Sequence, residues 1–262
     1  PGGNPNPMPP ERRHPLLRLV RTDRGKHAEA AGVPIGDQLA DHAALARCAP
    51  PLKQDDDRQL FLLDLLLELR QADQVIDAST MAVYPGLVNT HHHLYQIFSR
   101  NLPEVQRMEL FPWLVTLYEV WKNLDEEVVT WSSLTGLGEL LKTGCTTCFD
   151  HHYVFPQSGG DLIAAQFRAA ARLGIRLVAS RGSMDLSQKD GGLPPDSVVQ
   201  TIDEILADSE RLVRVWHDPA PYSMRQVVLA PCSPFSVSGD LLRESADLAR
   251  SLGVRLHTHV AE

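Results

Sequence analysis

A repeated alternation of helix-like and strand-like segments from residue 125 onward constrains the fold of this chain most strongly. Amphipathic helices are predicted at about residues 125–143, 161–173, 197–215 and 240–252. Asp125 is a typical helix cap, the helices are stopped by Gly144, Gly174 or Gly253, and short apolar strands follow them. Because successive parallel strands need a crossover helix between them, the alternation predicts a parallel sheet with helices packed against it.

Polar and reactive side chains gather where the predicted strands end. The strands are predicted near residues 86–91, 146–150, 175–180, 226–230 and 254–259. In a (β/α)8 barrel the chemistry sits at these strand ends. An open doubly wound sheet binds ligands there too, but no glycine-rich phosphate loop follows the first strand here. We therefore predict an α/β fold, a (β/α)8 TIM barrel that is truncated after strand 5.

The first 71 residues differ in character from the rest. Nine of the 19 prolines fall at or before Pro51, and the apolar positions between residues 11 and 48 show no sustained period. We expect residues 1–71 to be an atypical, Pro-rich and partly disordered segment, and residues 72–262 to form the N-terminal part of the barrel. Two local elements are predicted near this boundary. They are a helix at residues 58–70, with a buried strand as the alternative, and short strands at residues 74–78 and 81–84.

Composition and charge narrow the class of protein. The chain has 262 residues, of which 43% are hydrophobic and 22% charged, as is usual for soluble globular proteins. The net charge of -8 argues against binding to nucleic acid or to anionic membranes. No apolar run approaches the ~20 residues of a membrane span, and no signal peptide is visible. Four cysteines are too few for a disulfide framework, which favours a reducing cytoplasm.

Two histidine motifs point to a metal site. His91 and His93 follow an apolar strand-like segment, and the period of two in a strand puts them on one face, with His92 on the other. A solvated polar loop could also carry three histidines. The metal interpretation is favoured because a second motif, His257 and His259, ends another strand-like segment. For His257 we expect a hydrogen-bonded core position, since it lies deeper in that strand.

The histidines and one carboxylate together suggest hydrolytic chemistry. A barrel could bring His91, His93 and His259 to one cation, and three imidazoles with one water make a catalytic zinc site. Glu262 lies three residues beyond His259, within reach of such a water. It is therefore the candidate general base and acid, with an ordinary loop carboxylate as the alternative.

These motifs resemble those of a known family. The segment Pro85-Gly-Leu-Val-Asn-Thr-His-x-His93 and the segment His257-x-His259-x-x-Glu262 look like the first and fifth strand signatures of the amidohydrolase superfamily. Further similarity is to its purine and s-triazine aminohydrolase branch, and most of all to the 8-oxoguanine deaminases. It lies in residues 91–96, 110–114, 144–153, 181–184, 189–195 and 230–236. The resemblance covers about residue 72 to the end of the chain.

The resemblance implies roles for individual residues. His91, His93 and His259 would be metal ligands, for zinc or alternatively iron, and Glu262 would be the catalytic proton shuttle. A metal-bound hydroxide would attack a ring carbon that bears an amino group, and ammonia would leave. The substrate would be a small nitrogen heterocycle, such as 8-oxoguanine, an s-triazine or an isocytosine-type ring. A homo-oligomer is compatible with the sequence. The residues that we expect to bind the substrate ring are Gln96, Trp113 and Phe235.

The resemblance also has limits that keep other functions open. The family carries a further histidine on strand six and an aspartate on strand eight, and this chain has no counterpart after Glu262. The alternative function is therefore an inactive barrel fragment that binds metal weakly or serves as an interaction module. A redox protein built on Cys145 and Cys148 is a weaker alternative, because cysteines within a strand are more often core residues.

Overall fold

The computed structural model describes residues 17–20, 74–78 and 81–260. The chain divides into two compact units, residues 1–85 and residues 86–262. In the first unit, β1 (Leu17–Val20) pairs in parallel with β2 (Gln74–Asp77). The strand predicted at residues 74–78 is thus present as β2, whereas residues 81–84 form no strand. The helix predicted at residues 58–70 lies outside the described residues, and a domain boundary after residue 71 stays a prediction.

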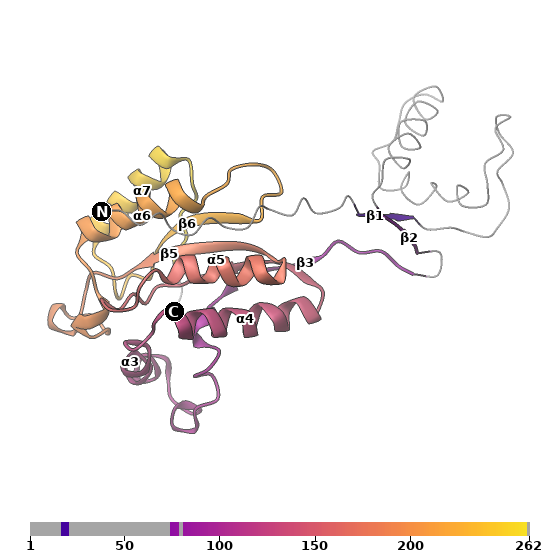
Figure 1. Cartoon of the computed structure of the whole chain (residues 1–262). Helices are drawn as coiled ribbons and strands as arrows, with labels where there is room; N and C mark the ends of the chain where they lie inside the picture. Colours follow the sequence, from indigo (N-terminus) through magenta and orange to yellow (C-terminus); the bar gives the residue numbers. More distant parts are fainter. Residues whose placement is uncertain (1–16, 21–73, 79–80, 261–262) are drawn as a thin grey trace, which may run out of the picture. The chain divides into compact units, whose positions relative to one another are not determined.

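The second unit is built on a sheet of four parallel strands, part of which is visible along the middle of its ribbon in Figure 1. They are β3 (Leu87–His92), β4 (Cys145–Asp150), β5 (Arg176–Ser183) and β6 (Arg225–Pro231). Their order in the sheet is the order in the chain. A doubly wound sheet would reverse direction at a switch point, whereas a barrel adds every strand on the same side. The predicted α/β fold of the TIM-barrel type is confirmed.

The segment predicted as the fifth strand runs beside β6 but pairs with it only briefly. Leu256 forms an isolated parallel bridge with Leu229. The backbone N–H of Leu229 donates to the Arg255 oxygen at 3.1 Å, and that of His257 donates to the Leu229 oxygen at 2.9 Å. The backbone N–H of His259 then donates to the Cys232 oxygen at 3.0 Å. The last segment therefore lies next to β6 in the strand order. Residues 257–259 reach the end of the sheet at which the other strands terminate.

Five α-helices occur in the second unit, four of them in the predicted alternation. They are α3 (Leu110–Trp121), α4 (Glu126–Lys142), α5 (Leu162–Leu173), α6 (Ile202–Trp216) and α7 (Gly239–Leu252). Short 3-10 turns lie between them. These are η2 (Leu94–Gln96), η3 (Pro103–Val105), η4 (Gln188–Asp190) and η5 (Asp196–Val198). Helix α3 was not predicted, because its cap residue Glu109 makes no side-chain cap bond and Pro112 falls in its first turn.

Local capping explains where the predicted helices begin and end. Asp125 and Asp161 each accept a backbone hydrogen bond at the start of α4 and α5. Gly174 ends α5 in the left-handed conformation, with φ 73°. The predicted start of α6 at residue 197 is wrong, because a capping box between Thr201 and Glu204 fixes the start at Ile202.

Helices cover one face of the sheet, and the other face carries the histidine motifs. Cys148 and Leu177 are fully buried among side chains of the helices. Phe149, next to Cys148 on β4, points the opposite way, and its ring lies 4.5 Å from that of His257. Cys145 is buried as well, so both cysteines of the Cys-x-x-Cys segment are core thiols, and burial raises the pKa of Cys148.

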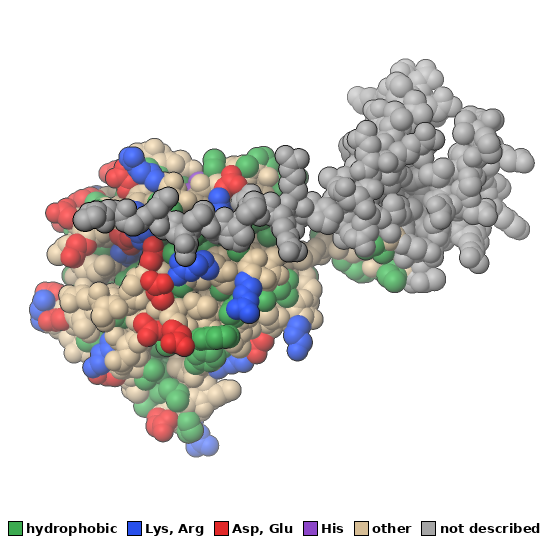
Figure 2. All heavy atoms as spheres, in the orientation of Figure 1, with side chains coloured by type: hydrophobic (Ala, Val, Ile, Leu, Met, Phe, Trp, Pro, Cys, Tyr) green, Lys and Arg blue, Asp and Glu red, His purple; other side chains and the backbone are tan. Residues whose placement is uncertain are grey.

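The surface mixes charges of both signs. Figure 2 shows acidic and basic side chains side by side on the visible face, over α5 and its neighbours. Many of them form ion pairs along a single helix, such as Arg214 with Glu210 on α6. Within the described part of the chain, no helix combines the length and the apolar character that crossing a membrane requires.

Candidate metal centre and substrate pocket

Three histidines from distant parts of the chain converge at the end of the sheet. His91 lies near the end of β3, and His93 follows it as the cap of η2. The Nε2 atom of His91 lies 3.2 Å from Nε2 of His93 and 3.2 Å from Nε2 of His259. The potential ligand atoms of all three lie within 4.8 Å of one another. The three histidines predicted as metal ligands are thus brought together.

Their outer ring nitrogens have partners that leave the inner nitrogens ready to bind a cation. The Nδ1 of His93 donates to the His151 carbonyl oxygen at 2.7 Å, and the Nδ1 of His259 donates to that of Cys232 at 2.9 Å. The Nε2 atoms of His93 and His259 then carry lone pairs that face inward, and facing lone pairs repel unless a cation lies between them. Zinc with Zn–N bonds of ~2.0–2.1 Å keeps tetrahedral ligand atoms about 3.3 Å apart, so the donor set fits zinc.

Burial keeps the rings of His91 and His93 neutral, which is the form that binds metal. Loss of hydration lowers the pKa of His93 to about 3, against the opposing effect of its hydrogen bond to the His151 carbonyl. The pKa of His91 is lowered too, first by burial and then by the neighbouring His259. At neutral pH no proton therefore competes with a cation for these two side chains.

A pocket opens directly on two of the three histidines. Its volume is about 200 Å³, and both His93 and His259 form part of its wall. Gln96, Trp113 and Phe235, the three residues predicted to bind the substrate ring, all line it. The ring of Phe235 meets that of Phe111 edge to face, with 5.2 Å between the ring centres. The other lining residues are Leu110, Leu114, Tyr118, Tyr153, Leu193, Cys232, Ser233 and Ser236.

The family model for the "Amidohydrolase family" matches residues 82–262, which is more than half of the chain. The chain belongs to the amidohydrolase family. Its second unit is therefore an amidohydrolase barrel segment, and the predicted resemblance is confirmed at the level of the family.

Named amidohydrolases of similar sequence act on nitrogen heterocycles. The 8-oxoguanine deaminase of Pseudomonas aeruginosa is 50% identical over 186 residues, which are 71% of this chain and 41% of that protein. The hydroxydechloroatrazine ethylaminohydrolase of Pseudomonas sp. strain ADP is 43% identical over 195 residues, or 73% of this chain and 40% of that protein. This chain thus spans about two fifths of the length of these relatives.

A solved structure of similar fold contains zinc. The atrazine chlorohydrolase of Arthrobacter aurescens, crystallised with zinc, aligns with a TM-score of 0.67 at 32% identity. The alignment covers 74% of this chain and 44% of that chain. A zinc-containing protein thus shares the fold of this amidohydrolase segment.

Gln96 is held in a fixed direction inside the amidohydrolase pocket. Its side-chain nitrogen donates to the hydroxyl of Tyr95 at 3.2 Å and to that of Tyr153 at 3.4 Å. Burial raises the pKa of Tyr95 well above its ordinary value, so that hydroxyl stays protonated. Because two hydroxyls hold the amide, it can meet a flat polar ligand without first becoming ordered.

A buried carboxyl group supports the turn that carries His93. Asp150, the last residue of β4, accepts a hydrogen bond from the backbone N–H of Leu94 at 2.6 Å. Its other oxygen accepts from the side-chain nitrogen of Gln166 at 2.5 Å. Burial raises the pKa of Asp150 to about 7. The carboxyl thereby fastens β4 and α5 to the residue that directly follows His93.

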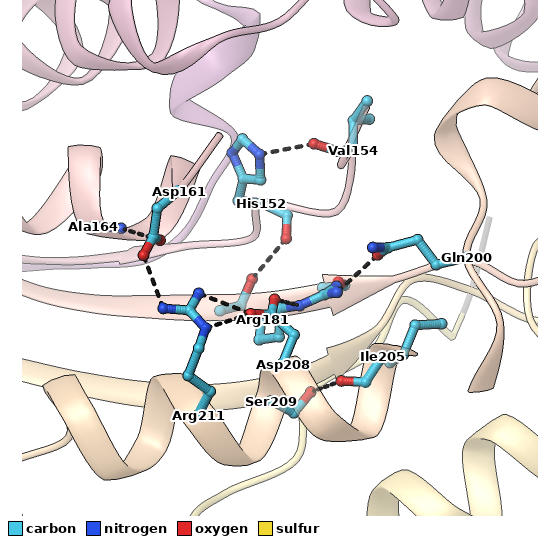
Figure 3. A network of polar contacts seen from close by, with 12 residues as sticks. His152, Val154, Asp161, Ala164, Arg181, Gln200, Ile205, Asp208, Ser209 and Arg211 are labelled. Carbon is cyan, nitrogen blue, oxygen red and sulfur yellow. Dashed lines mark hydrogen bonds and ion pairs between the residues drawn. The ribbon is translucent and has the colours of Figure 1, made fainter. Parts of the chain in front are cut away.

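A buried ion-pair network joins β5, α6 and neighbouring loops (Figure 3). Arg181 on β5 is fully buried, with its guanidinium carbon 4.0 Å from the centre of the Phe155 ring. It donates to Asp208 at 2.6 Å and to Gln200 at 2.7 Å. Asp208 also accepts from Arg211 at 2.8 Å. Loops after β4 and β5 are thus tied to α6.

Several contacts of the site were not predicted from the sequence. His257 is half-buried rather than a core residue, and its Nε2 lies 3.2 Å from Nδ1 of His91. His151 is fully buried beneath the cluster, with its ring stacked 4.4 Å from that of His259. Tyr153 lines the pocket and was not predicted, although residues that closely follow a barrel strand are expected near the active site. Glu262 lies outside the described residues, and its role stays a prediction.

Proposed function

We propose that this chain forms the metal centre and substrate pocket of a hydrolytic deaminase for a nitrogen heterocycle such as 8-oxoguanine. The single observation that carries the proposal is the convergence of His91, His93 and His259 on one point, with His93 and His259 in the wall of an aromatic-lined pocket. The 50% identity to an 8-oxoguanine deaminase supports the substrate class.

The proposed metal is zinc, with iron as the alternative. His91, His93 and His259 would hold it through their Nε2 atoms. When bound, the cation would lower the pKa of a coordinated water to about 7 and so supply a nucleophile at neutral pH. The carbonyl oxygens of His151 and Cys232 keep His93 and His259 oriented with their lone pairs inward.

The pocket suits a flat heterocycle with polar edges. The indole of Trp113 and the ring of Phe235 offer apolar faces on which a purine or triazine ring can stack. The fixed carboxamide of Gln96 offers its oxygen as a hydrogen-bond acceptor to ring N–H groups. Together they would hold the amino-bearing carbon toward the three histidines.

Glu262 is the proposed proton carrier. As a carboxylate it would take a proton from the attacking water and deliver it to a ring nitrogen. The oxygen of that water would form a bond to the ring carbon. Its remaining proton would pass to the amino group as the carbon–nitrogen bond breaks, so that ammonia leaves and a ring carbonyl remains. Water and heterocycle are the two substrates, so no oxidant or other reactant is required.

A second candidate substrate is a hydroxylated s-triazine. It is favoured by the 43% identity to the hydroxydechloroatrazine ethylaminohydrolase and by the structural similarity to the atrazine chlorohydrolase. The same pocket would accept it, because the triazine ring is also flat and polar at its edges. The released product would then be an alkylamine in place of ammonia.

Elemental analysis of the purified chain tests the metal centre. We expect about one zinc or iron per chain, lost in His91→Ala and His259→Ala. His217→Ala is the matched control, because the His217 side chain follows α6 and accepts a hydrogen bond from the backbone N–H of Val227; this variant should keep its metal.

Product assays then separate the substrate classes. Metal-loaded chain should release ammonia from 8-oxoguanine faster than alkylamine from a hydroxylated s-triazine, and the reverse order would favour the second candidate. Folded chain without metal would contradict the proposal and leave an inactive barrel segment.

A further inference from the structure

Each of the three clustered histidines has a different partner at its outer nitrogen. His93 and His259 donate to backbone carbonyls, which no side-chain substitution can remove. The Nδ1 of His91 instead lies 3.2 Å from Nε2 of His257, a side chain. His91 is therefore the clustered histidine whose orientation depends on another residue's identity.

His257 is held firmly enough to act as a partner. Its backbone N–H donates to the Leu229 oxygen at 2.9 Å, which ties it to β6. Its ring lies 4.5 Å from the ring of Phe149 and 5.1 Å from that of His151. Contacts with β4 and β6 thus fix the ring against His91 without using its Nε2 atom.

We infer that His257 is a positioning residue that accepts a hydrogen bond from Nδ1–H of His91 and so fixes the tautomer of that ring. The inference rests on the proposed function, in which the Nε2 atom of His91 binds the cation. A neutral imidazole carries one proton, so a proton held at Nδ1 leaves the Nε2 lone pair facing His93 and His259.

The opposite arrangement would not support metal binding. If His257 donated to His91, the His91 proton would move to Nε2 and point at the other two histidines. A second cation shared by His91 and His257 would require both nitrogens of His91 to bind metal. A neutral imidazole cannot do this, because one of its nitrogens carries a proton. The accepting role is the one that matches the geometry of all three histidines. Loss of such a partner typically weakens metal binding by about 10–100-fold.

Two substitutions at one position separate this role from packing. His257→Phe keeps a flat ring against Phe149 but has no acceptor. His257→Gln retains an acceptor oxygen near the place of Nε2. Cobalt(II) is the probe, because its visible spectrum reports its ligand geometry, and competition with a chelator gives its dissociation constant.

The expected result is a dissociation constant raised about 10–100-fold in His257→Phe, with an altered cobalt spectrum, and rescue to within a few-fold in His257→Gln. The melting temperatures of both metal-free variants serve as the control for folding. Equal affinity and equal spectra in His257→Phe and the unaltered chain would overturn the inference.

The outcomes also distinguish this inference from the proposed function. Cobalt bound by the unaltered chain and by His257→Phe alike would reject the inference and leave the metal centre standing. An unaltered chain that binds no cobalt would reject the metal centre and the inference with it. A metal-loaded chain without deaminase activity would reject only the proposed reaction.

Discussion

Single side chains at the end of β4 show how burial sets protonation near the site. Asp150 and His152 are both fully buried. Burial raises the pKa of Asp150 to about 7 and lowers that of His152 to about 3. Both shifts disfavour the charged form. His152 Nε2–H donates to the Val154 oxygen at 2.9 Å, and its Nδ1 lies 3.5 Å from the Gln166 amide nitrogen.

His152 should make the fold sensitive to mild acid. In the unfolded chain its pKa returns to about 6.5, so between pH 6.5 and 3 only the unfolded state takes up the proton. Stability from this residue is complete above pH 6.5 and is lost as pH falls toward 3. In His152→Gln the amide can still donate to Val154. The loss of unfolding free energy between pH 7.5 and 5 should therefore shrink by about 2 kcal/mol.

Urea unfolding at pH 7.5 and 5 measures this difference. An equal loss in both proteins would mean that His152 is protonated in the folded state, which would contradict its burial.

Prediction from sequence succeeded at residues whose pattern repeats and failed where the partner comes from elsewhere. The period of a strand was sufficient to put His91 and His93 on one face. The contact of His257 with His91 depends on how closely β3 and the last segment approach across the sheet, which spacing within either motif does not contain. Tyr153 enters the pocket through the path of a loop, and loops carry no period.

Among secondary-structure elements, α6 is attached to the sheet through one buried charge, the guanidinium of Arg181 on β5, which pairs with Asp208 on the helix. The side chain of Arg181 has no exposed surface, while that of its partner Asp208 is 29% exposed. Removing one member of a buried pair leaves the other charge uncompensated. Asp208→Ala should therefore lower the free energy of unfolding by about 3–5 kcal/mol.

The matched control for Asp208→Ala lies two positions further along the same helix. Glu210 pairs with Arg214 on the exposed side of α6, so Glu210→Ala should cost only about 0–1 kcal/mol. Urea denaturation of both variants makes the comparison. Similar losses in the two variants would mean that Arg181 finds another partner or is reached by water.

Elements were predicted best where local capping decides them. The bounds of α5 and α7 agree with prediction to within one residue, because Asp161, Gly174 and Gly253 act within a single turn. Helix α3 lacks such signals, and its place is set by packing of Leu117 and Trp121 into the core. The last predicted strand is reduced to one bridge, since pairing depends on neighbours more than on propensity.

For the whole molecule, the order of strands follows from the order of elements in the chain. Each crossover helix returns the chain to the same end of the sheet, so successive strands are added in one direction. The C-terminal ends of the strands therefore lie along one edge. That rule predicted both the barrel type and the meeting of His91 with His259. It could not predict the pocket wall formed by α3, because that helix lies outside the repeat.

The meeting of His91 and His259 also makes a bound cation a cross-link. The two residues are 168 positions apart, and joining them would close a loop that contains most of the described chain. In the chain-entropy model, closing a loop of this size removes on the order of 5 kcal/mol of freedom from the unfolded state. Bound metal would thus stabilise the folded state as a cross-link does. Its removal would first free the last segment, which pairs with β6 through a single bridge.

Hydrogen exchange can follow that release. After chelation, the amides of His257 and His259, which bond to Leu229 and Cys232, should exchange faster, while amides between β4 and β5 change little. Equal acceleration throughout the sheet would mean that the whole unit opens at once. A segment-specific change would mean that the last segment separates from β6 before the rest of the sheet opens, and that a single bound ion prevents this separation.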